Sequence, residues 1–356
     1  MNTAQVNYLN IGLMIVSAIV AFIIPFELFL FSYAVLGPLH YLTEISWLHK
    51  RQYFSTGKRD YWLLILLTIL ILLPSMFLYL YDWLGVKDDK GNPVYTKAMA
   101  DFINGLHSWG TGLTFFAFAG GAIFALIKNT RNRWIGFAIA AIIALVISPR
   151  GDNPSKGAVF LIFSVFLPTL IHVFVFTGAF ILVGALKSKS ASGLLSILVF
   201  LGCAVSFFLI SPGGGGYAIS TYAKESYDES FYSLNAQIFK SFLHTPSPTA
   251  DHIYSSGIGI LITRFIAYAY TYHYLNWFSK TSIIKWHDVP RRWLVTIFAL
   301  WILAVVLYYT DYKTGLQALL FLSFLHVVLE FPLNFQSFKQ IGQEIKTRLF
   351  SPSKAT

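Results

Sequence analysis

Long apolar segments recur along the whole sequence, and they constrain the fold more than any other feature. A helix needs about 20 mostly apolar residues to cross the core of a bilayer. Segments near that length predict ten spans, at 8–24, 27–48, 61–81, 101–127, 134–148, 158–186, 192–211, 253–278, 293–309 and 315–335. The expected fold class is therefore all-α, a polytopic membrane helix bundle in which residues 1–356 form a single transmembrane domain.

Composition supports this prediction and excludes other classes of protein. Hydrophobic residues make up 56% of the chain and charged residues only 12%, whereas soluble domains carry about 25% charged residues. The net charge of +10 would suggest nucleic acid in a soluble protein, but loop cations facing an anionic inner leaflet explain it better here. We expect no nucleic-acid partner. The single cysteine, Cys203, excludes a disulfide framework and a thiolate metal site.

The distribution of lysine and arginine predicts an orientation in the membrane. With the N-terminus inside, the segments on the cytoplasmic side hold about twice as many of the 26 basic residues as the outer segments. Such an inward bias is typical of cytoplasmic loops. Both termini are therefore predicted to be cytoplasmic. We expect a multi-pass protein of a cell membrane, with the bacterial inner membrane as its location and membrane lipid as a partner.

The predicted outer segment 212–252 is too long for a simple turn. Ser226 and Glu229 have the spacing of a capping box, which predicts a helix start. Apolar residues follow at helical spacing, at Phe231, Leu234, Ile238 and Phe242. We interpret this segment as an amphipathic helix on the outer surface, placed as a lid.

Two predicted spans each contain a histidine and a glutamate four residues apart. His40 and Glu44 lie in the span 27–48, and His326 and Glu330 lie in the span 315–335. Four residues is about one helical turn, so both side chains of a pair share one face of their helix. Ionisable groups inside a membrane are costly, and they usually face the bundle interior and carry function.

Three further histidines fall in other predicted spans. His172 lies near the middle of its span, and His273 lies somewhat towards the cytoplasmic end of its own. His107 lies inside its span only if that helix begins near Asp101. At 1.5 Å per residue, counting from the helix ends brings these histidines and the two pairs towards one layer. Imidazoles and carboxylates suit iron, zinc or manganese, and two histidines with one carboxylate suit non-haem iron. The predicted metal ligands are His40, His107, His172, His273 and His326, with Glu44 and Glu330 as direct ligands or as acceptors of their hydrogen bonds.

Simpler interpretations of these residues stay open. A single histidine in a membrane helix commonly hydrogen-bonds to a neighbouring helix. A glutamate one turn away can merely orient the imidazole. The same groups can also relay protons, as they do in transporters. The rival function is therefore a proton- or ion-coupled transporter, although the sequence shows no internal repeat. A third possibility is a scaffold whose polar groups only join helices.

The segment around His40 resembles a motif of a known family. Pro38–Glu44, with the sequence PLHYLTE, is similar to the Pro-His-Gly-Ala-x-Asp motif of the Brp/Blh family of integral membrane β-carotene-cleaving dioxygenases. Tyr270–Trp277, with the sequence YTYHYLNW, looks like the aromatic-rich His-x-x-x-His helix of that family, with Trp277 in place of the second histidine. The resemblance implies iron held by membrane histidines. It assigns the family's other histidines to His107 and to His326 near Glu330, and His172 is a candidate replacement for the missing one.

These observations together predict a histidine-rich membrane metalloenzyme. The leading hypothesis is an iron-dependent oxygenase that acts on a lipid-soluble small molecule, such as a carotenoid or other isoprenoid. The expected cofactor is Fe²⁺, with zinc or manganese as alternatives. Glu44 and Glu330 are the candidate catalytic acids. The sequence identifies no protein partner.

Overall fold

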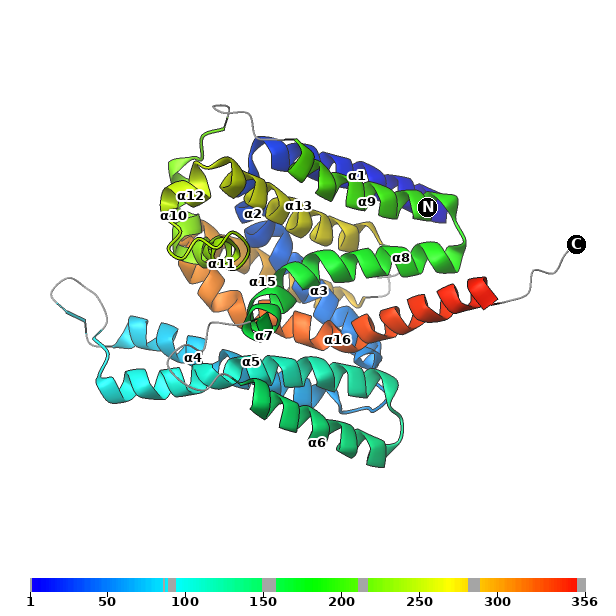
Figure 1. Ribbon diagram of the computed structural model, residues 1–356, viewed down its shortest axis with the longest axis horizontal. Helices are drawn as coiled ribbons and strands as arrows, with labels where there is room; N and C mark the ends of the chain where they lie inside the picture. Colours follow the sequence, from blue (N-terminus) through cyan, green and yellow to red (C-terminus); the bar gives the residue numbers. More distant parts are fainter. Residues whose placement is uncertain are drawn as a thin grey trace, which may run out of the picture. The chain divides into compact units, whose positions relative to one another are not determined.

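A computed structural model describes residues 2–85, 87–88, 94–148, 158–210, 217–280 and 289–350. Within these ranges every regular element is a helix, which agrees with the all-α prediction. Figure 1 labels the elements along the chain. Most consecutive helices are joined by a short turn, and a few are joined by longer connections.

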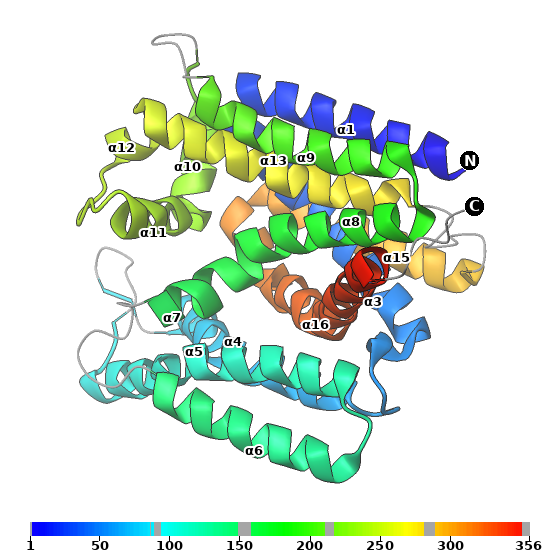
Figure 2. The ribbon, with the colours of Figure 1, turned by 45° about the vertical axis from the view of Figure 1, so that its right-hand side comes forward.

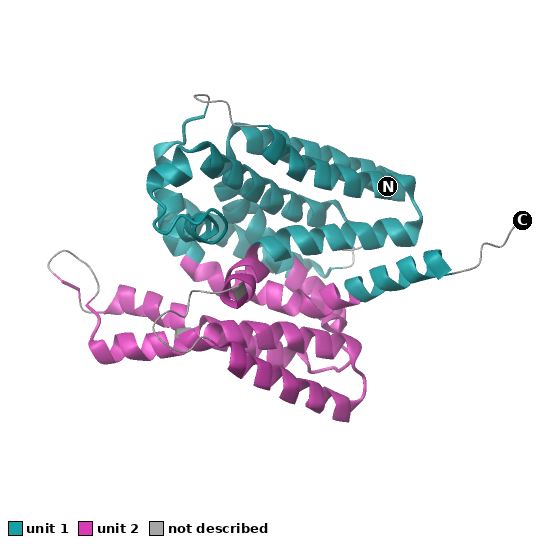
Figure 3. Cartoon of the chain, in the orientation of Figure 1, with its two compact units in different colours: residues 1–43, 170–316, 337–356 teal, residues 44–169, 317–336 magenta. Residues whose placement is uncertain are grey.

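The described chain falls into two compact units (Figure 3). Unit 1 comprises residues 1–43, 170–316 and 337–356, and unit 2 comprises residues 44–169 and 317–336. Each unit therefore draws on segments that are distant in sequence. The prediction of one transmembrane domain over residues 1–356 is left untested by this division.

Unit 1 is built around helix α13, Gly257–Ser279. Helices α1 (Thr3–Ile23) and α9 (Ala191–Leu209) run beside it and beside each other, as the views of Figures 1 and 2 agree. Four tyrosines of α13 are 5% exposed or less: Tyr268, Tyr270, Tyr272 and Tyr274. Because other helices surround α13, its hydroxyl and imidazole groups face protein, where they find partners such as the Phe200 carbonyl, 3.0 Å from Tyr268 Oη.

The start of the chain in unit 1 forms two helices separated by one residue. Asn2 and Gln5 form a capping box at the start of α1, with both hydrogen bonds at 2.9 Å. Proline favours the first turn of a helix, where its missing N–H costs nothing, and α2 accordingly begins at Pro25 and ends at Phe31. A π-helix, η1 (Ser32–Leu36), then leads into α3, Gly37–Lys50.

The remaining elements of unit 1 include the predicted outer segment. The three helices there are α10 (Thr221–Ser230), α11 (Tyr232–Phe242) and α12 (Ala250–Tyr254). The predicted helix start at Ser226 is wrong, because Ser220 caps α10 and Ser226 is buried inside that helix. Leu234 and Ile238 of α11 are buried, as the apolar spacing predicts, whereas Phe242 is exposed. Residues 212–216 of the predicted lid lie outside the described residues.

Unit 1 also contains the helices α8 (Thr177–Ser188) and α15 (Arg291–Thr310). Three elements pass from one unit to the other: helix α3, helix α16 (Tyr312–Phe350) and π-helix η3 (Leu161–Phe176).

Unit 2 contains three consecutive long helices, α4 (Tyr61–Leu84), α5 (Lys97–Leu126) and α6 (Thr130–Ile147). Short elements complete it, at η2 (Gln52–Phe54) and α7 (Ala158–Phe160). Arg133 ties its turns together: Nη2 lies 3.0 Å from Asp60 Oδ2, and Nε donates to the Ile127 carbonyl at 2.8 Å. Helix α5 also packs tightly on α16, since a Cβ added at Gly121 would lie 2.5 Å from Phe331 Cβ.

Among the described residues, nine helices are long and apolar enough to cross a membrane. They match nine of the ten predicted spans, with Pro25–Lys50 and Leu161–Ser188 each continuing through a π-helix. The tenth predicted span is α13, which has the length but is too polar to qualify on composition. The membrane bundle is thus supported, while the count of ten and the cytoplasmic termini stay predictions.

Candidate metal centre

His40 lies on α3, four residues after the π-helix η1 ends. Its side chain is 1% exposed. A π-helix in the middle of a span widens the backbone and is frequent at functional sites. The Val35 carbonyl accepts a hydrogen bond from Trp301 Nε1 at 2.8 Å, and the Leu30 carbonyl accepts one from Tyr312 Oη at 3.0 Å. Side chains from α15 and the start of α16 therefore stabilise the backbone just before His40.

Helix α3 is held against α13 on the side of His40. A Cβ added at Gly37 would lie 3.3 Å from Tyr274 Oη, so the two helices approach closely there. Trp277 Nε1 donates to Thr43 Oγ1 at 2.9 Å, and Thr43 Oγ1 donates to the Leu39 carbonyl at 2.7 Å. These contacts fix where the His40 ring lies relative to α13.

His273 lies on α13 and faces His40. The two Nε2 atoms are 3.0 Å apart, and the ring centroids are 4.6 Å apart. On its other side, His273 Nδ1 lies 2.8 Å from Thr177 Oγ1, at the start of α8. If Nδ1–H donates to this hydroxyl, the neutral ring presents the lone pair of Nε2 towards His40.

His172 is the third histidine of unit 1 in this group. It lies in π-helix η3, it is 2% exposed, and its ring centroid is 4.8 Å from that of His273. The sequence interval from His172 to Thr177 spans the end of η3 and the start of α8. One segment thus supplies both a candidate ligand and the hydroxyl that orients another.

Three of the five predicted ligands lie in unit 1 and form one group of donor atoms. One ligand atom from each of His40, His172 and His273 lies within 4.8 Å of the others, and all three side chains are buried. Such a group could hold a metal ion. His326 belongs to the part of α16 that is in unit 2. The arguments below rest on the three histidines of unit 1.

The donor set fits a transition metal. Two His–metal bonds of about 2.0–2.1 Å place their nitrogens about 3.0 Å apart at a right angle and about 3.4 Å apart at a tetrahedral angle. The observed 3.0 Å between His40 and His273 matches this range. It also matches a hydrogen bond between the two rings, which one Nε2–H would donate. Imidazole donors suit zinc, copper, iron and nickel, so the geometry does not select the metal.

The two acids are buried next to histidines on their own helices. Glu44 is 1% exposed and Glu330 is 2% exposed. The observed helices keep the predicted one-turn spacing, from His40 to Glu44 on α3 and from His326 to Glu330 on α16. Whether either acid is a ligand stays a prediction.

The structure describes less of His107 than of the other predicted ligands. It lies in helix α5 of unit 2, but its side chain lies outside the described part of the chain. The assignment of His107 to the metal is therefore left open. Helix α5 begins at Lys97, which satisfies the condition under which His107 lies inside its span.

Sequence reasoning missed the hydroxyl of Thr177. Its signal was present, since Thr177 is a polar residue in an otherwise apolar stretch from Val173 to Val183. The sequence does not predict the direction of the Thr177 side chain, because the π-helix η3 shifts the helical register just before α8.

Comparison with family models, curated proteins and solved structures found no match to this chain. The functional argument therefore rests on the site itself.

Proposed function

We propose that this chain is a metal-dependent membrane enzyme, an iron oxygenase that acts on a lipid-soluble substrate such as a carotenoid or another isoprenoid. One observation carries the proposal: Nε2 of His40 and Nε2 of His273 converge to 3.0 Å inside a buried site, while Thr177 engages the other nitrogen of His273. Hydrogen bonding to the outer nitrogen is the usual way in which a protein orients a histidine ligand.

The choice of iron rests on the kind of donors and on the resemblance to the Brp/Blh family. Histidines with a nearby carboxylate suit non-haem iron, which supplies dioxygen activation when bound. The same donors suit zinc or manganese, and elemental analysis decides between them. Glu44 and Glu330 would act as ligands or would accept hydrogen bonds from ligand histidines.

A pocket in unit 1 supports a lipid-soluble substrate. The Glu27 pocket has a volume of about 260 Å³ and borders α2, η1, α10, α15 and the first residue of α16. Its lining is mostly apolar or aromatic: Glu27, Leu30, Phe31, Ala34, Val35, Tyr222, Ala223, Val305, Tyr308, Tyr309 and Tyr312. Val35 precedes His40 by five residues on the same continuous span, about 7.5 Å along a helix. An apolar chain in this pocket would thus lie one to two helical turns from His40.

The only acid in that lining is held by hydrogen bonds among the described residues. Tyr217 Oη donates to Glu27 Oε2 at 2.7 Å, and the Ser220 N–H donates to Oε1 at 3.0 Å. Burial, together with the bond to Glu27, raises the pKa of Tyr217 well above its ordinary value, so this phenol stays protonated and keeps donating. The carboxylate can then accept a hydroxyl of a substrate at the polar end of the pocket.

Metal content tests the proposal directly. Wild type, His40→Ala, His273→Ala and the control His244→Ala would be purified identically and analysed for iron, zinc and manganese. His244 is exposed and lies outside the group, so its variant should keep the wild-type metal. We expect about one metal per chain in wild type and a loss of most of it in the other two. Equal metal in all four proteins would refute the centre.

A second measurement addresses the reaction. Iron-loaded wild type in detergent would be mixed with a carotenoid, and loss of polyene absorbance would be followed with and without dioxygen. We expect loss only with dioxygen and only in proteins that hold iron. A folded wild type that takes up none of the three metals would favour the transporter.

A further inference from the structure

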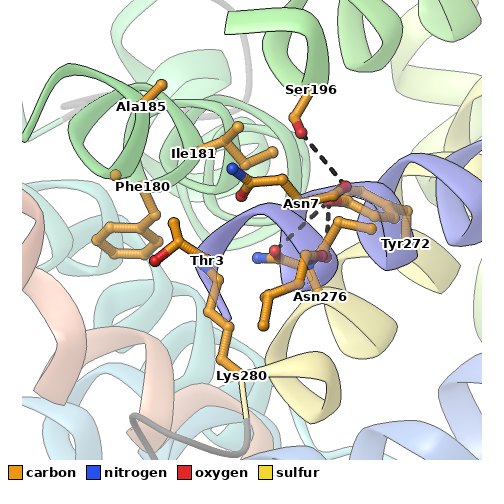
Figure 4. A pocket seen from close by; sticks show the side chains of 12 residues that line it. Thr3, Asn7, Phe180, Ile181, Ala185, Ser196, Tyr272, Asn276 and Lys280 are labelled. Carbon is orange, nitrogen blue, oxygen red and sulfur yellow. Dashed lines mark hydrogen bonds between the residues drawn. The ribbon is translucent and has the colours of Figure 1, made fainter. Parts of the chain in front are cut away.

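A second cavity in unit 1 is separate from the Glu27 pocket. This Lys280 pocket has a volume of about 330 Å³, within the range of small-molecule sites. Four helix segments enclose it, from α1, α8, α9 and the end of α13. Figure 4 shows the side chains around it, which are Thr3, Val6, Asn7, Asn10, Phe180, Ile181, Gly184, Ala185, Ser196, Tyr272, Asn276 and Lys280.

The polar groups of this lining favour an anion. Among the described residues that line the pocket, Lys280 is the one charged residue. Several uncharged donors surround it, from three asparagines, a serine, a threonine and a tyrosine. A lysine among neutral amides and hydroxyls suits a ligand with several acceptor oxygens and a negative charge, as a phosphate has.

Hydrogen bonds connect several residues of the pocket lining. Asn10 Oδ1 accepts from Tyr272 Oη at 3.2 Å and from Ser279 Oγ at 2.9 Å, which joins α1 to α13. Tyr272 Oη also lies 3.4 Å from Asn276 Oδ1. The single hydroxyl hydrogen of Tyr272 therefore points to one of these two amide oxygens at a time. Asn276 lines the pocket, and no hydrogen bond to another described residue uses its Nδ2.

The position of the pocket indicates where its ligand comes from. It lies where α1 begins and where α8 and α13 end, at one end of the predicted spans. Lys187 and Lys189 are exposed beside it at the turn from α8 to α9, and Arg348 Nη2 donates to the Leu186 carbonyl at 2.8 Å. Clusters of basic residues at the end of a span are typical of contacts with anionic lipid headgroups.

The apolar part of the lining suits a lipid more than a free ion. Val6, Phe180 and Ile181 line the same cavity as Lys280. Residues of α1 near the pocket are exposed and apolar, as at Tyr8 and Leu9, so the pocket adjoins a face that the membrane would cover. A free phosphate gains nothing from contact with these apolar groups. The glycerol backbone and the first acyl-chain carbons of a phospholipid can pack against them.

We propose that the Lys280 pocket binds the phosphate of an anionic membrane phospholipid at the cytoplasmic end of unit 1. Lys280 and the amide of Asn276 bind the phosphate oxygens, and Val6, Phe180 and Ile181 contact the start of the acyl chains. This inference does not depend on the metal centre, and either proposal can fail without the other.

Thermal stability in nanodiscs tests the proposal. Wild type would be compared in phosphatidylcholine alone and in phosphatidylcholine with phosphatidylglycerol. Two pairs of variants separate charge from volume. Lys280→Gln removes the pocket cation, and Lys240→Gln removes an exposed cation of α11 that does not line the pocket. Gly184→Leu fills the pocket, and Gly202→Leu is its control; a Cβ at either glycine meets no atom within 4 Å.

We expect phosphatidylglycerol to raise the Tm of wild type, of Lys240→Gln and of Gly202→Leu. Lys280→Gln and Gly184→Leu should lose most of that rise, and their affinity for phosphatidylglycerol measured by titration in detergent should fall roughly ten-fold or more, as expected for loss of a charge-assisted hydrogen bond. Their metal content should match wild type. The same rise in all five proteins would overturn the proposal. So would an equal rise with inorganic phosphate or glycerol phosphate in phosphatidylcholine, which would assign the pocket to a soluble phosphate.

Discussion

Thr177 Oγ1 lies 2.8 Å from His273 Nδ1, and both side chains are buried. A hydroxyl in this place can fix the tautomer of the ring and so direct its Nε2 towards His40. The contact connects α8 to α13 within unit 1. It makes Thr177 a positioning residue for the candidate metal centre.

Replacing Thr177 by valine should therefore weaken metal binding while keeping the shape of the side chain. Loss of such an orienting partner typically costs 10–100-fold in metal affinity. Metal affinity would be measured by competition with a chelator. Thr177→Ser should restore most of the affinity because it keeps the hydroxyl. Thr169→Val is a matched control, since Thr169 Oγ1 donates only to the Val165 carbonyl of its own helix in the described residues. Wild-type affinity in Thr177→Val would exclude the orienting role.

The acids give an independent test of the same centre. If Glu44 and Glu330 bind a metal or hold its histidine ligands, Glu44→Gln and Glu330→Gln should each lower metal affinity by about 10–100-fold. Glutamine keeps the volume, so folding should survive. The exposed acid Glu225 provides the control Glu225→Gln. Full metal occupancy in both variants at limiting metal would remove the acids from the site.

Close packing in unit 2 predicts an effect on stability alone. A Cβ at Gly121 would lie 2.5 Å from Phe331 Cβ, whereas a Cβ at Gly120 would lie 3.5 Å from the Phe137 ring. Gly121→Ala must push α5 away from α16 and should cost about 1–3 kcal/mol, as overpacking does. Gly120→Ala should be neutral or slightly stabilising, because alanine favours a helix. Denaturant unfolding in detergent would measure both variants, and equal stabilities would contradict the packing.

The helical class and the candidate ligands were accessible from sequence for a simple reason. The length of an apolar segment predicts a membrane span directly. An ionisable residue inside such a segment, such as His40 or Glu44, is easy to recognise. The same logic placed α13 among the spans, and the structure explains its polarity by its central position in unit 1. Composition alone does not distinguish such a surrounded helix from one that faces lipid.

Two features that shape the centre were not predictable from residue spacing. The π-helices η1 and η3 precede or contain His40 and His172, and they rotate side chains away from the faces that a period of 3.6 assigns. The helix start expected at Ser226 failed for a related reason. Ser220, six residues earlier, can cap a helix in the same way. The local sequence does not show which of the two serines begins the helix.

The predicted topology can be tested by cysteine labelling on intact cells. The charge bias places the turn near Lys58 inside and α10 outside. Lys58 and Glu225 are both exposed, so cysteines there should react when reagent reaches them. In a Cys203→Ser background, a membrane-impermeant maleimide should label Glu225→Cys and spare Lys58→Cys until the membrane is opened. The opposite pattern would reverse the orientation, and with it the cytoplasmic assignment of the Lys280 pocket.

The hydrogen bond between Trp277 and Thr43 should couple α13 to α3 energetically. Trp277 Nε1 donates to Thr43 Oγ1 at 2.9 Å, and the Trp277 ring lies 5.6 Å from that of His40 in an edge-on arrangement. Trp277→Phe removes the donor and keeps an aromatic ring, and Thr43→Val removes the acceptor and keeps the volume. Each single change also disturbs other contacts, so only the double-mutant cycle isolates the pair. We expect a coupling of about 0.5–1.5 kcal/mol in the free energy of unfolding, the usual net value of one hydrogen bond. Because this bond holds α3 beside His273, both single variants should also bind metal more weakly than wild type. Strictly additive stabilities together with unchanged metal affinity would mean that the bond does not position His40.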